Sequence, residues 1–318
     1  MVTTRDRADK ASIQTLKYFH VKDSNGIITD RTRSIIRLIV SFGVPQKSVF
    51  TVLHGILTSH GITVIGSFDT HSVRRIVLEG GVLATCQLGQ ELHDTPTATV
   101  AGDGTTYKNV NLESAFVTLK TSITSEQDAQ ANRQSHQTRA LPLLAATSHT
   151  SAAQLAGWDT RIQNIIAIWN ACPISDGQPL SLADILGKLK GMLSDHANDQ
   201  KSLCAMFAEW KRRVDREERG KAALELMSGA EIIDAYMPFV SEAIAEAGGY
   251  DAWENMPEAE KKASLAEIYK QTVHALGEER FQQLPDEVKW FVDLFLWGGC
   301  GMHKAMNAEV REVLLILL

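Results

Sequence analysis

The chain has 318 residues, 44% of them hydrophobic, and a formal charge of −6, so it can build real cores and is not expected to be disordered or uniformly basic. Four widely spaced cysteines form no Cys-x-x-Cys pair, which excludes a disulfide framework and a four-cysteine zinc site. No apolar stretch is long enough for a membrane span or a secretory signal, so we expect a soluble intracellular protein with no membrane partner.

Residues 1–93 are predicted to be helical. Apolar residues recur at helical spacing over 35–39 and again over 49–57, and the break between them contains Gly43 and Pro45. Two short helices joined in this way resemble a helix-turn-helix, which suggests DNA binding. A plain helical subdomain is the alternative.

A third helix is predicted over residues 69–88, and it contains the candidate DNA-binding residues Arg74 and Arg75. Residues 1–93 have eleven Lys and Arg against seven Asp and Glu, so this part of the chain is locally basic. Such an arginine pair is more often a solvated helix face than a phosphate clamp. The same reading applies to the Lys-Arg-Arg run at 211–213, which is too short for a nuclear signal.

The pattern changes to strands near residue 97. Residues 97–103 alternate up to Asp103, a turn is expected at 104–109, and the odd positions of 115–119 form one apolar face, so we predict a hairpin. The stretch ALPLLAATS supplies a third short strand. Residues 149–170 then show a helical apolar stripe.

A second acid, Asp195, follows a short apolar strand in GMLSDHANDQ, and a helix with a Phe and Trp stripe comes next. Three strands, a helix, a strand and a helix are the order of the RNase H-like plan. In that plan an acid on the first strand meets an acid at the end of the fourth, so Asp103 in its turn is expected to meet Asp195 around a metal.

The predicted fold class is therefore α+β or α/β, with three regions. Residues 1–93 form a helical, helix-turn-helix-like region, and residues 94–214 form an RNase H-like mixed sheet core. Residues 215–318 are expected to be all-helical, with a helix running from Pro285 to the glycine pair at 298–299.

Two such carboxylates favour Mg²⁺ or Mn²⁺, because oxygen ligands suit these cations, and a pair of ions can activate a nucleophile and stabilise a leaving oxygen in phosphodiester chemistry. Other readings stay open. Asp-Gly at Asp103 is a common turn signal, and Asp195 could cap its helix. Motifs of kinases, serine hydrolases and dehydrogenases are absent from the sequence.

Four stretches resemble the transposase-derived proteins of basidiomycete fungi, of the Kyakuja-Dileera-Zisupton group, and more distantly hAT transposases. They are GDGTTYKNVNLES, SHTSAAQLAGW, LSDHANDQKSL and CGMHKAMN. The resemblance implies catalytic aspartates at Asp103 and Asp195, a Cys-x-x-His element at Cys300 and His303, transposon-end DNA as partner and a nuclear location. Without the resemblance, Cys300 and His303 are interpreted either as half of a zinc site or as a pair with a structural role.

His196 and Asp199 lie near Asp195 in sequence and are candidate supporting groups, with a helix-cap role as the alternative. The resemblance also implies a catalytic Glu beyond the Cys-x-x-His element. Here the chain stops after AEVREVLLILL, so Glu309 is the candidate third ligand and a truncated copy is expected. The Leu-rich end is an association surface if exposed, which makes a homo-oligomer compatible with the sequence.

Three readings result. The first is a transposase-like enzyme that cleaves and transfers DNA strands with divalent metal, inactive if the third acid is lost. The second is a domesticated, non-catalytic module that binds DNA or protein. In the third, an α-rich scaffold, Asp103 and Asp195 only end strands and never meet.

Overall fold

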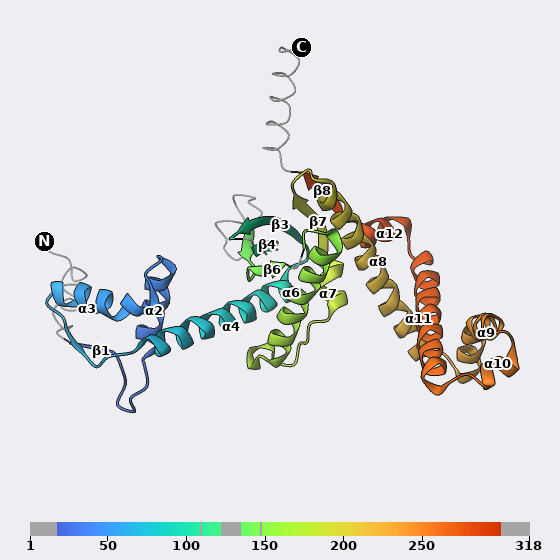
Figure 1. The fold of residues 1–318 in the computed structure, drawn as a ribbon, viewed down its shortest axis with the longest axis horizontal. Helices are drawn as coiled ribbons and strands as arrows, with labels where there is room; N and C mark the ends of the chain where they lie inside the picture. The colour runs from blue at the N-terminus through green and yellow to red at the C-terminus, as the bar shows by residue number, and fades with distance from the viewer. Residues whose placement is uncertain (1–17, 109, 122–134, 147, 300–318) are drawn as a thin grey trace, which may run out of the picture. The chain divides into compact units, whose positions relative to one another are not determined.

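The computed structural model describes residues 18–108, 110–121, 135–146 and 148–299 (Figure 1). These residues form ten α-helices and a six-stranded mixed sheet, so the architecture is mixed α/β. The chain divides into two compact units, Met1–Gln87 and Leu88–Leu318. The predicted boundary after residue 93 lies close to this division, whereas the one after residue 214 falls inside a helix.

The first unit is built around two helices packed on a small apolar core. Its elements are β1 (Tyr18–His20), α2 (Asp30–Ser41), a 3₁₀ turn (Gln46–Ser48), α3 (Val49–Ser59), β2 (Thr63–Ile65) and the start of α4 (Thr70–Asp94). Helix α2 begins where the Thr29 side chain accepts a hydrogen bond from Thr32 N, and Gly43, at a φ of 84°, follows its end.

The core of this unit confirms the apolar periodicity of α2 and α3, since Ile36, Val49 and Leu53 are buried together. The third predicted helix is also present, as α4. The expectation of an all-helical region was wrong in one respect, because β1 and β2 pair as a short parallel sheet with Tyr18 opposite Thr63. Three-residue strands are too short to show a period of two in the sequence.

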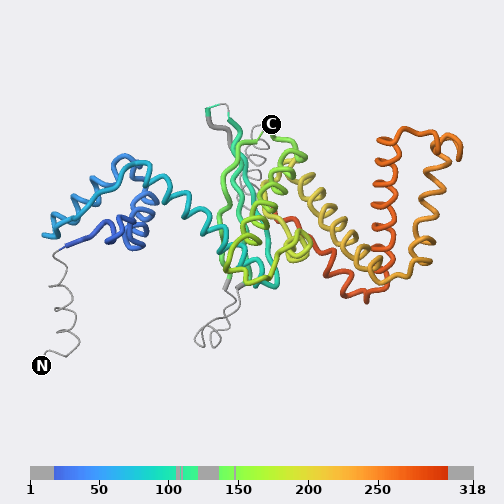
Figure 2. The backbone as a smooth tube through the Cα atoms, turned by 90° about the horizontal axis from the view of Figure 1, so that it is seen from below, coloured from blue at the N-terminus to red at the C-terminus, as the bar shows by residue number. Residues whose placement is uncertain are grey.

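The second unit is centred on the mixed sheet, whose strands run side by side in the middle of Figure 2. The strands are β3 (Ala98–Tyr107), β4 (Val110–Thr121), β5 (Ser135–Ala140), β6 (Leu144–Ala146), β7 (Leu189–Ser194) and β8 (Leu296–Gly299). Their order is β5-β4-β3-β7-β8, and β6 pairs with β4. Strand β4 is antiparallel to β3 and β5, whereas β3, β7 and β8 are mutually parallel.

Two predictions about the first strands need correction. The hairpin turn begins only at Lys108, which adopts a φ of 49°, and not at residue 104, so β3 runs through Asp103 and Gly104 to Tyr107. The third strand is split, because the polar segment Ser135–Ala140 forms β5 and only Leu144–Ala146 of the predicted strand forms β6. The edge position of β5 explains its polarity, since an edge strand needs no apolar run.

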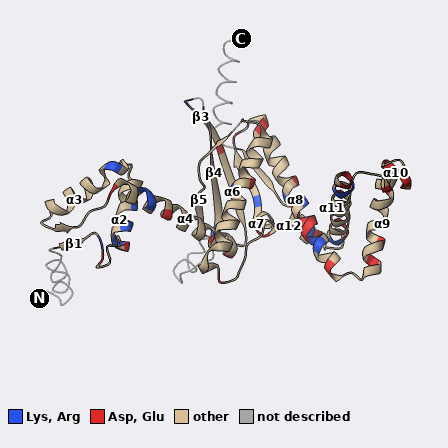
Figure 3. Cartoon of the chain, turned by 60° about the horizontal axis from the view of Figure 1, so that its bottom comes forward, with Lys and Arg blue, Asp and Glu red and all other residues tan. Residues whose placement is uncertain are grey.

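Helices α6 (Ser151–Ala171), α7 (Leu182–Lys188) and α8 (Asn198–Leu226) lie on one side of β3, β4 and β5 (Figure 3). Trp158 of α6 and Phe207 of α8 meet edge to face, with ring centroids 5.8 Å apart. Their burial confirms the predicted helical stripes, and with the inward side chains of β3, β4 and β7 they form the main core.

The remaining helices are α9 (Gly229–Glu246), α10 (Tyr250–Glu254), α11 (Glu258–Gln282) and α12 (Asp286–Asp293). Helix α11 crosses α8 closely, because a Cβ on Gly220 would lie 1.8 Å from the Val273 carbonyl oxygen and one on Gly277 would lie 1.8 Å from that of Arg216. Helices α9 to α12 confirm the prediction of a helical C-terminal region, but only up to residue 293.

The expectation that the C-terminal region is all-helical was wrong, because Leu296–Gly299 forms β8 beside β7. The two backbones approach so closely that a Cβ on Gly191 would lie 2.5 Å from the Leu296 carbonyl oxygen. A bare glycine on β7 and the exposed edge of the sheet thus favour strand pairing over continuation of the helix.

Candidate functional site

Asp103 lies inside β3, where its register partner is Ser114 of β4. The Ser114 hydroxyl donates a hydrogen bond to the Asp103 backbone carbonyl, at 3.0 Å, and the Asp103 side chain is exposed. The Asp-Gly turn signal was therefore wrong, because the ladder with β4 continues through Tyr107. A strand interior holds a carboxylate more rigidly than a turn does.

Asp195 directly follows β7 and precedes α8. Its Oδ1 accepts a hydrogen bond from Ala197 N at 3.0 Å, and Ala197 is the N-cap residue of α8. Asp195 therefore helps to begin α8, as the helix-cap alternative predicted, although the N-cap residue itself is Ala197. This bond uses one carboxylate oxygen and orients the group at the carboxyl end of β7.

The pairing of β3 with β7 bears on whether the two acids meet. These strands are parallel, with Val100 opposite Met192 and Ala101 opposite Leu193. The ladder ends at this pair, two residues before Asp103 on β3 and two residues before Asp195, which follows the end of β7. Both acids thus come after the last paired residues of two adjacent parallel strands, at the carboxyl end of that ladder.

Alternation along β3 decides which face Asp103 occupies. A Cβ on Gly102 would lie 3.6 Å from the Trp158 ring, so Gly102 faces α6, and Asp103 as the next residue faces the other way. Leu193, opposite Ala101, belongs to the same outer face and is 52% exposed. The two aspartates are therefore on the solvent-facing side of the sheet rather than under α6.

A third acid near this edge, Glu113, was missed by the sequence analysis. It is buried on β4 opposite Gly104, its Oε2 lies 3.6 Å from Arg161 Nη1, and its Oε1 has no hydrogen-bond partner among the described residues. Arg161 also donates to the Glu113 carbonyl oxygen at 2.9 Å. A signal existed, because Glu113 continues the odd-numbered apolar face of β4 and is a charge where an apolar residue is expected.

The Glu113 and Arg161 pair is an internal ion pair of the fold. Burial lowers the pKa of the Arg161 guanidinium, and the Glu113 carboxylate opposes this. Glu113 lines a cavity of about 10 Å³ under α6, which has room for at most one water molecule. The Glu113 side chain thus lies on the opposite face of the sheet from the Asp103 side chain, and its charge is paired with that of Arg161.

His196 packs under the end of β8. Its ring meets Trp297 edge to face at 5.1 Å, and a Cβ on Gly299 would lie 2.1 Å from the imidazole, so this packing requires glycine there. The His196 Nε2 is buried without a hydrogen-bond partner in the described part of the chain. Trp297 in turn donates to the Ser194 hydroxyl at 3.1 Å.

Asp199 is part of a polar contact between α6 and α8. Its Oδ2 accepts a hydrogen bond from Gln154 Nε2 at 3.2 Å, and its carbonyl oxygen accepts one from the Ser151 hydroxyl at 2.7 Å. Gln200 donates to the Gln154 side-chain oxygen at 2.8 Å. These contacts fix the start of α8 against α6, so Asp199 positions the helix that follows Asp195.

Cys300, His303 and Glu309 lie outside the described residues. Within residues 18–299, apart from the gaps given above, no cluster of three or more His, Cys, Asp or Glu side chains could hold a metal ion. The described chain therefore offers no three-ligand group around Asp103 or Asp195.

The candidate DNA-binding surface lies in the first unit. Arg74 and Arg75 are exposed on α4, and neither forms an ion pair with another described residue. Helix α3, the second helix of the predicted helix-turn-helix, has no Lys or Arg along its length. Exposed apolar side chains lie on α2 and α3 or next to them. They are Leu38, Phe42 and Ile56.

No protein-family model, no curated protein and no solved structure matches this chain. No helix in the described ranges combines the length and the apolar content that crossing a bilayer requires. We therefore infer function from the strand order and from the side chains placed at its edge.

Proposed function

We propose that the second unit is an RNase H-like core of transposase type, in which Asp103 and Asp195 bind a divalent cation for DNA strand cleavage and transfer. The observation that supports this most is the strand order β5-β4-β3-β7-β8, with β4 antiparallel and β3, β7 and β8 parallel. The connections support the same proposal, since α6 and α7 come between the first strands and β7, and α8 follows β7.

The two aspartates fit a hard cation. Both supply oxygen, they come from adjacent parallel strands, and the hydrogen bond from Ala197 N leaves Asp195 Oδ2 for a ligand. Such donors suit Mg²⁺ or Mn²⁺, which when bound would polarise a phosphoryl oxygen and activate water. With two carboxylates the affinity is expected to be low, and Glu309 remains the proposed third ligand.

The residues of the chain would act by positioning. The β3 ladder holds Asp103 in place, and the Asx turn with Ala197 holds Asp195. In the first unit, Arg74 and Arg75 are proposed to contact the phosphates of transposon-end DNA, for which an exposed, unpaired guanidinium is suited. A nuclear location follows from this proposal.

A second function, a non-catalytic interaction module, is favoured by one observation. Helix α3 has no basic residue to read or hold DNA, and Ile56 on it is 53% exposed. Phe42, at the end of α2, is 80% exposed. An apolar surface of this kind suits a protein partner better than a phosphate backbone.

The test is Mn²⁺ binding by calorimetry, together with nicking of supercoiled plasmid in Mn²⁺, on the full chain. Asp103→Asn and Asp195→Asn preserve shape and remove the charge, and Asp234→Asn on the exposed surface of α9 is the matched control. We expect both site variants to lose metal binding and nicking, and the control to keep them.

Metal binding that is lost in the site variants without any nicking in the parent protein would support the non-catalytic alternative with the fold retained. Mn²⁺ binding that is unchanged in both site variants would contradict the proposed site.

A further inference from the structure

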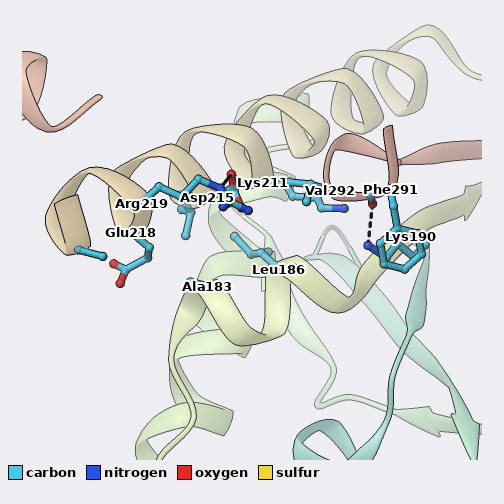
Figure 4. A pocket seen from close by; sticks show the side chains of 12 residues that line it. Ala183, Leu186, Lys190, Lys211, Asp215, Glu218, Arg219, Phe291 and Val292 are labelled. Atoms are coloured by element: carbon cyan, nitrogen blue, oxygen red, sulfur yellow. Dashed lines mark hydrogen bonds and ion pairs between the residues drawn. The ribbon is translucent and has the colours of Figure 1, made fainter. Parts of the chain in front are cut away.

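A cleft of about 380 Å³ lies between α7, α8 and α12, away from the Asp103 and Asp195 edge (Figure 4). Leu186 of α7, Val214 of α8 and Val292 of α12 form apolar walls. In Figure 4, Lys190 and Phe291 lie at one end of the cleft and Glu218 at the other. This volume is within the range of small-ligand sites.

Lys211 is a buried cation in this cleft. The prediction that Lys211 lies on a solvated helix face was wrong, since its exposed fraction is only 2%. Its Nζ donates hydrogen bonds to the carbonyl oxygens of Leu189, at 2.9 Å, and Leu294, at 2.8 Å. The third hydrogen-bonding position of its ammonium group is directed at the side chain of Lys190.

Lys190, on β7, faces the same end of the cleft. Its Nζ donates to the Phe291 carbonyl oxygen at 2.9 Å and lies 3.7 Å from the centroid of the Phe291 ring. Within the described chain, neither Lys190 nor Lys211 has a carboxylate within 4.0 Å. The two neighbouring lysines thus bond to three different backbone oxygens, and Lys190 also lies over an aromatic ring, without a direct counter-charge.

The carboxylates of the cleft are already paired. Asp215 accepts hydrogen bonds from Arg219, at 2.8 Å, and from Arg216, at 2.9 Å. Glu218 accepts one from Lys221 at 2.7 Å. The lysine end of the cleft is therefore the part whose charge an incoming group could balance.

We propose that this cleft binds a small amphipathic anion, with its anionic head between Lys190 and Lys211 and its apolar body against Leu186 and Val214. A carboxylate or phosphate head would accept charge-assisted hydrogen bonds from the two ammonium groups. The apolar walls would exclude water from the body of the ligand. The proposal does not depend on metal binding by the second unit.

The titration of Lys211 adds a direction to this proposal. Burial and the nearby Lys190 lower the pKa of Lys211 to about 7, while Asp293 and Asp215 oppose the shift. An anion binds the protonated form best, so its affinity rises as the pH falls through 7. The lowered pKa of Lys190, which also results mainly from burial, acts in the same direction.

The experiment titrates the full chain with decanoate by calorimetry, at pH 6.5 and pH 8.5, and with decyltrimethylammonium as the cation of equal chain length. Lys190→Met removes one charge at the head site. Gly187→Leu fills the cleft, and a Cβ there meets nothing within 4 Å, so this variant is expected to fold. Lys270→Met on the exposed face of α11 is the matched control.

We expect decanoate to bind more tightly at pH 6.5, and each cleft variant to weaken it by at least about tenfold, while Lys270→Met leaves it unchanged. Circular dichroism of each variant establishes that it is folded. Equal affinity for the cationic probe, unchanged binding in both folded cleft variants, or no binding of decanoate to the parent protein would each overturn the proposal.

Discussion

The replacement of Lys211 by Met should change how the stability of the protein depends on pH. The pKa of Lys211 is lowered to about 7 in the folded chain, whereas an unfolded lysine keeps its ordinary value of 10.5. Between these two values the unfolded chain holds a proton that the folded chain has released. Stability therefore rises with pH from about 7 upward, and below pH 7 both states are protonated.

The magnitude follows from the same two values. A pKa difference of one unit corresponds to about 1.4 kcal/mol, so the contribution of Lys211 grows by about 3 kcal/mol between pH 7 and pH 9. Lys211→Met abolishes this rise. It also leaves the Leu189 and Leu294 carbonyl oxygens without this donor, which costs about 1–3 kcal/mol each at every pH.

At low pH the two effects of Lys211→Met nearly cancel. The variant loses the hydrogen bonds to the two carbonyl oxygens, but it no longer has to bury a charged ammonium group as the parent protein does. We expect the two proteins to be closest in stability near pH 6.5, and the variant to fall behind by about 3 kcal/mol more at pH 9. Urea denaturation at pH 6.5, 8 and 9 measures this. Parallel stability profiles for the two proteins would refute the reasoning, because the lysine would then titrate alike in both states.

Two further substitutions test how the second unit is held together. Gly220→Ala should lower the free energy of unfolding by about 2–3 kcal/mol, measured in urea, because the new Cβ would lie 1.8 Å from the Val273 carbonyl oxygen. Gly229→Ala is the control, since a Cβ there meets nothing within 4 Å, and it should leave the stability unchanged. Equal stability of the two variants would mean that α8 and α11 can move apart freely. Arg161→Met should lower the free energy of unfolding at pH 7 by about 3–5 kcal/mol, because Glu113 is then buried and unpaired. Adding Glu113→Met should recover most of that stability. A double variant no more stable than the single one would contradict the ion pair.

Much of the second unit was predictable because its signals are local. Helices α6 and α8 follow from apolar residues spaced to share one face, and strand β7 follows from a short apolar run before Asp195. The hairpin of β3 and β4 was also found, although its turn was placed too early. In each case the residues that carry the signal are neighbours in the chain.

The errors share a physical origin in long-range pairing. Strand β8 exists because Gly191 allows the backbone of Leu296 to approach β7 from a segment that reads locally as helix. Asp103 lies within a strand because β4 continues to pair with it, which overrides the turn preference of Asp-Gly. Whether the local helix preference near Leu296 or the turn preference of Asp-Gly prevails depends on the partner strand, which the local sequence does not identify.

The sequence by itself determined the helices whose apolar periodicity is local, α2, α3, α6 and α8, and where the second acid follows its strand, since periodicity and capping act between near neighbours. Only the tertiary structure decided that β3 and β7 lie side by side, so that Asp103 and Asp195 both come at the carboxyl end of their ladder. It alone also placed Lys190 and Lys211 together in an apolar cleft closed by α12. Burial and strand register arise from contacts between distant segments, and a charge such as Lys211 looks the same in sequence whether water or protein surrounds it.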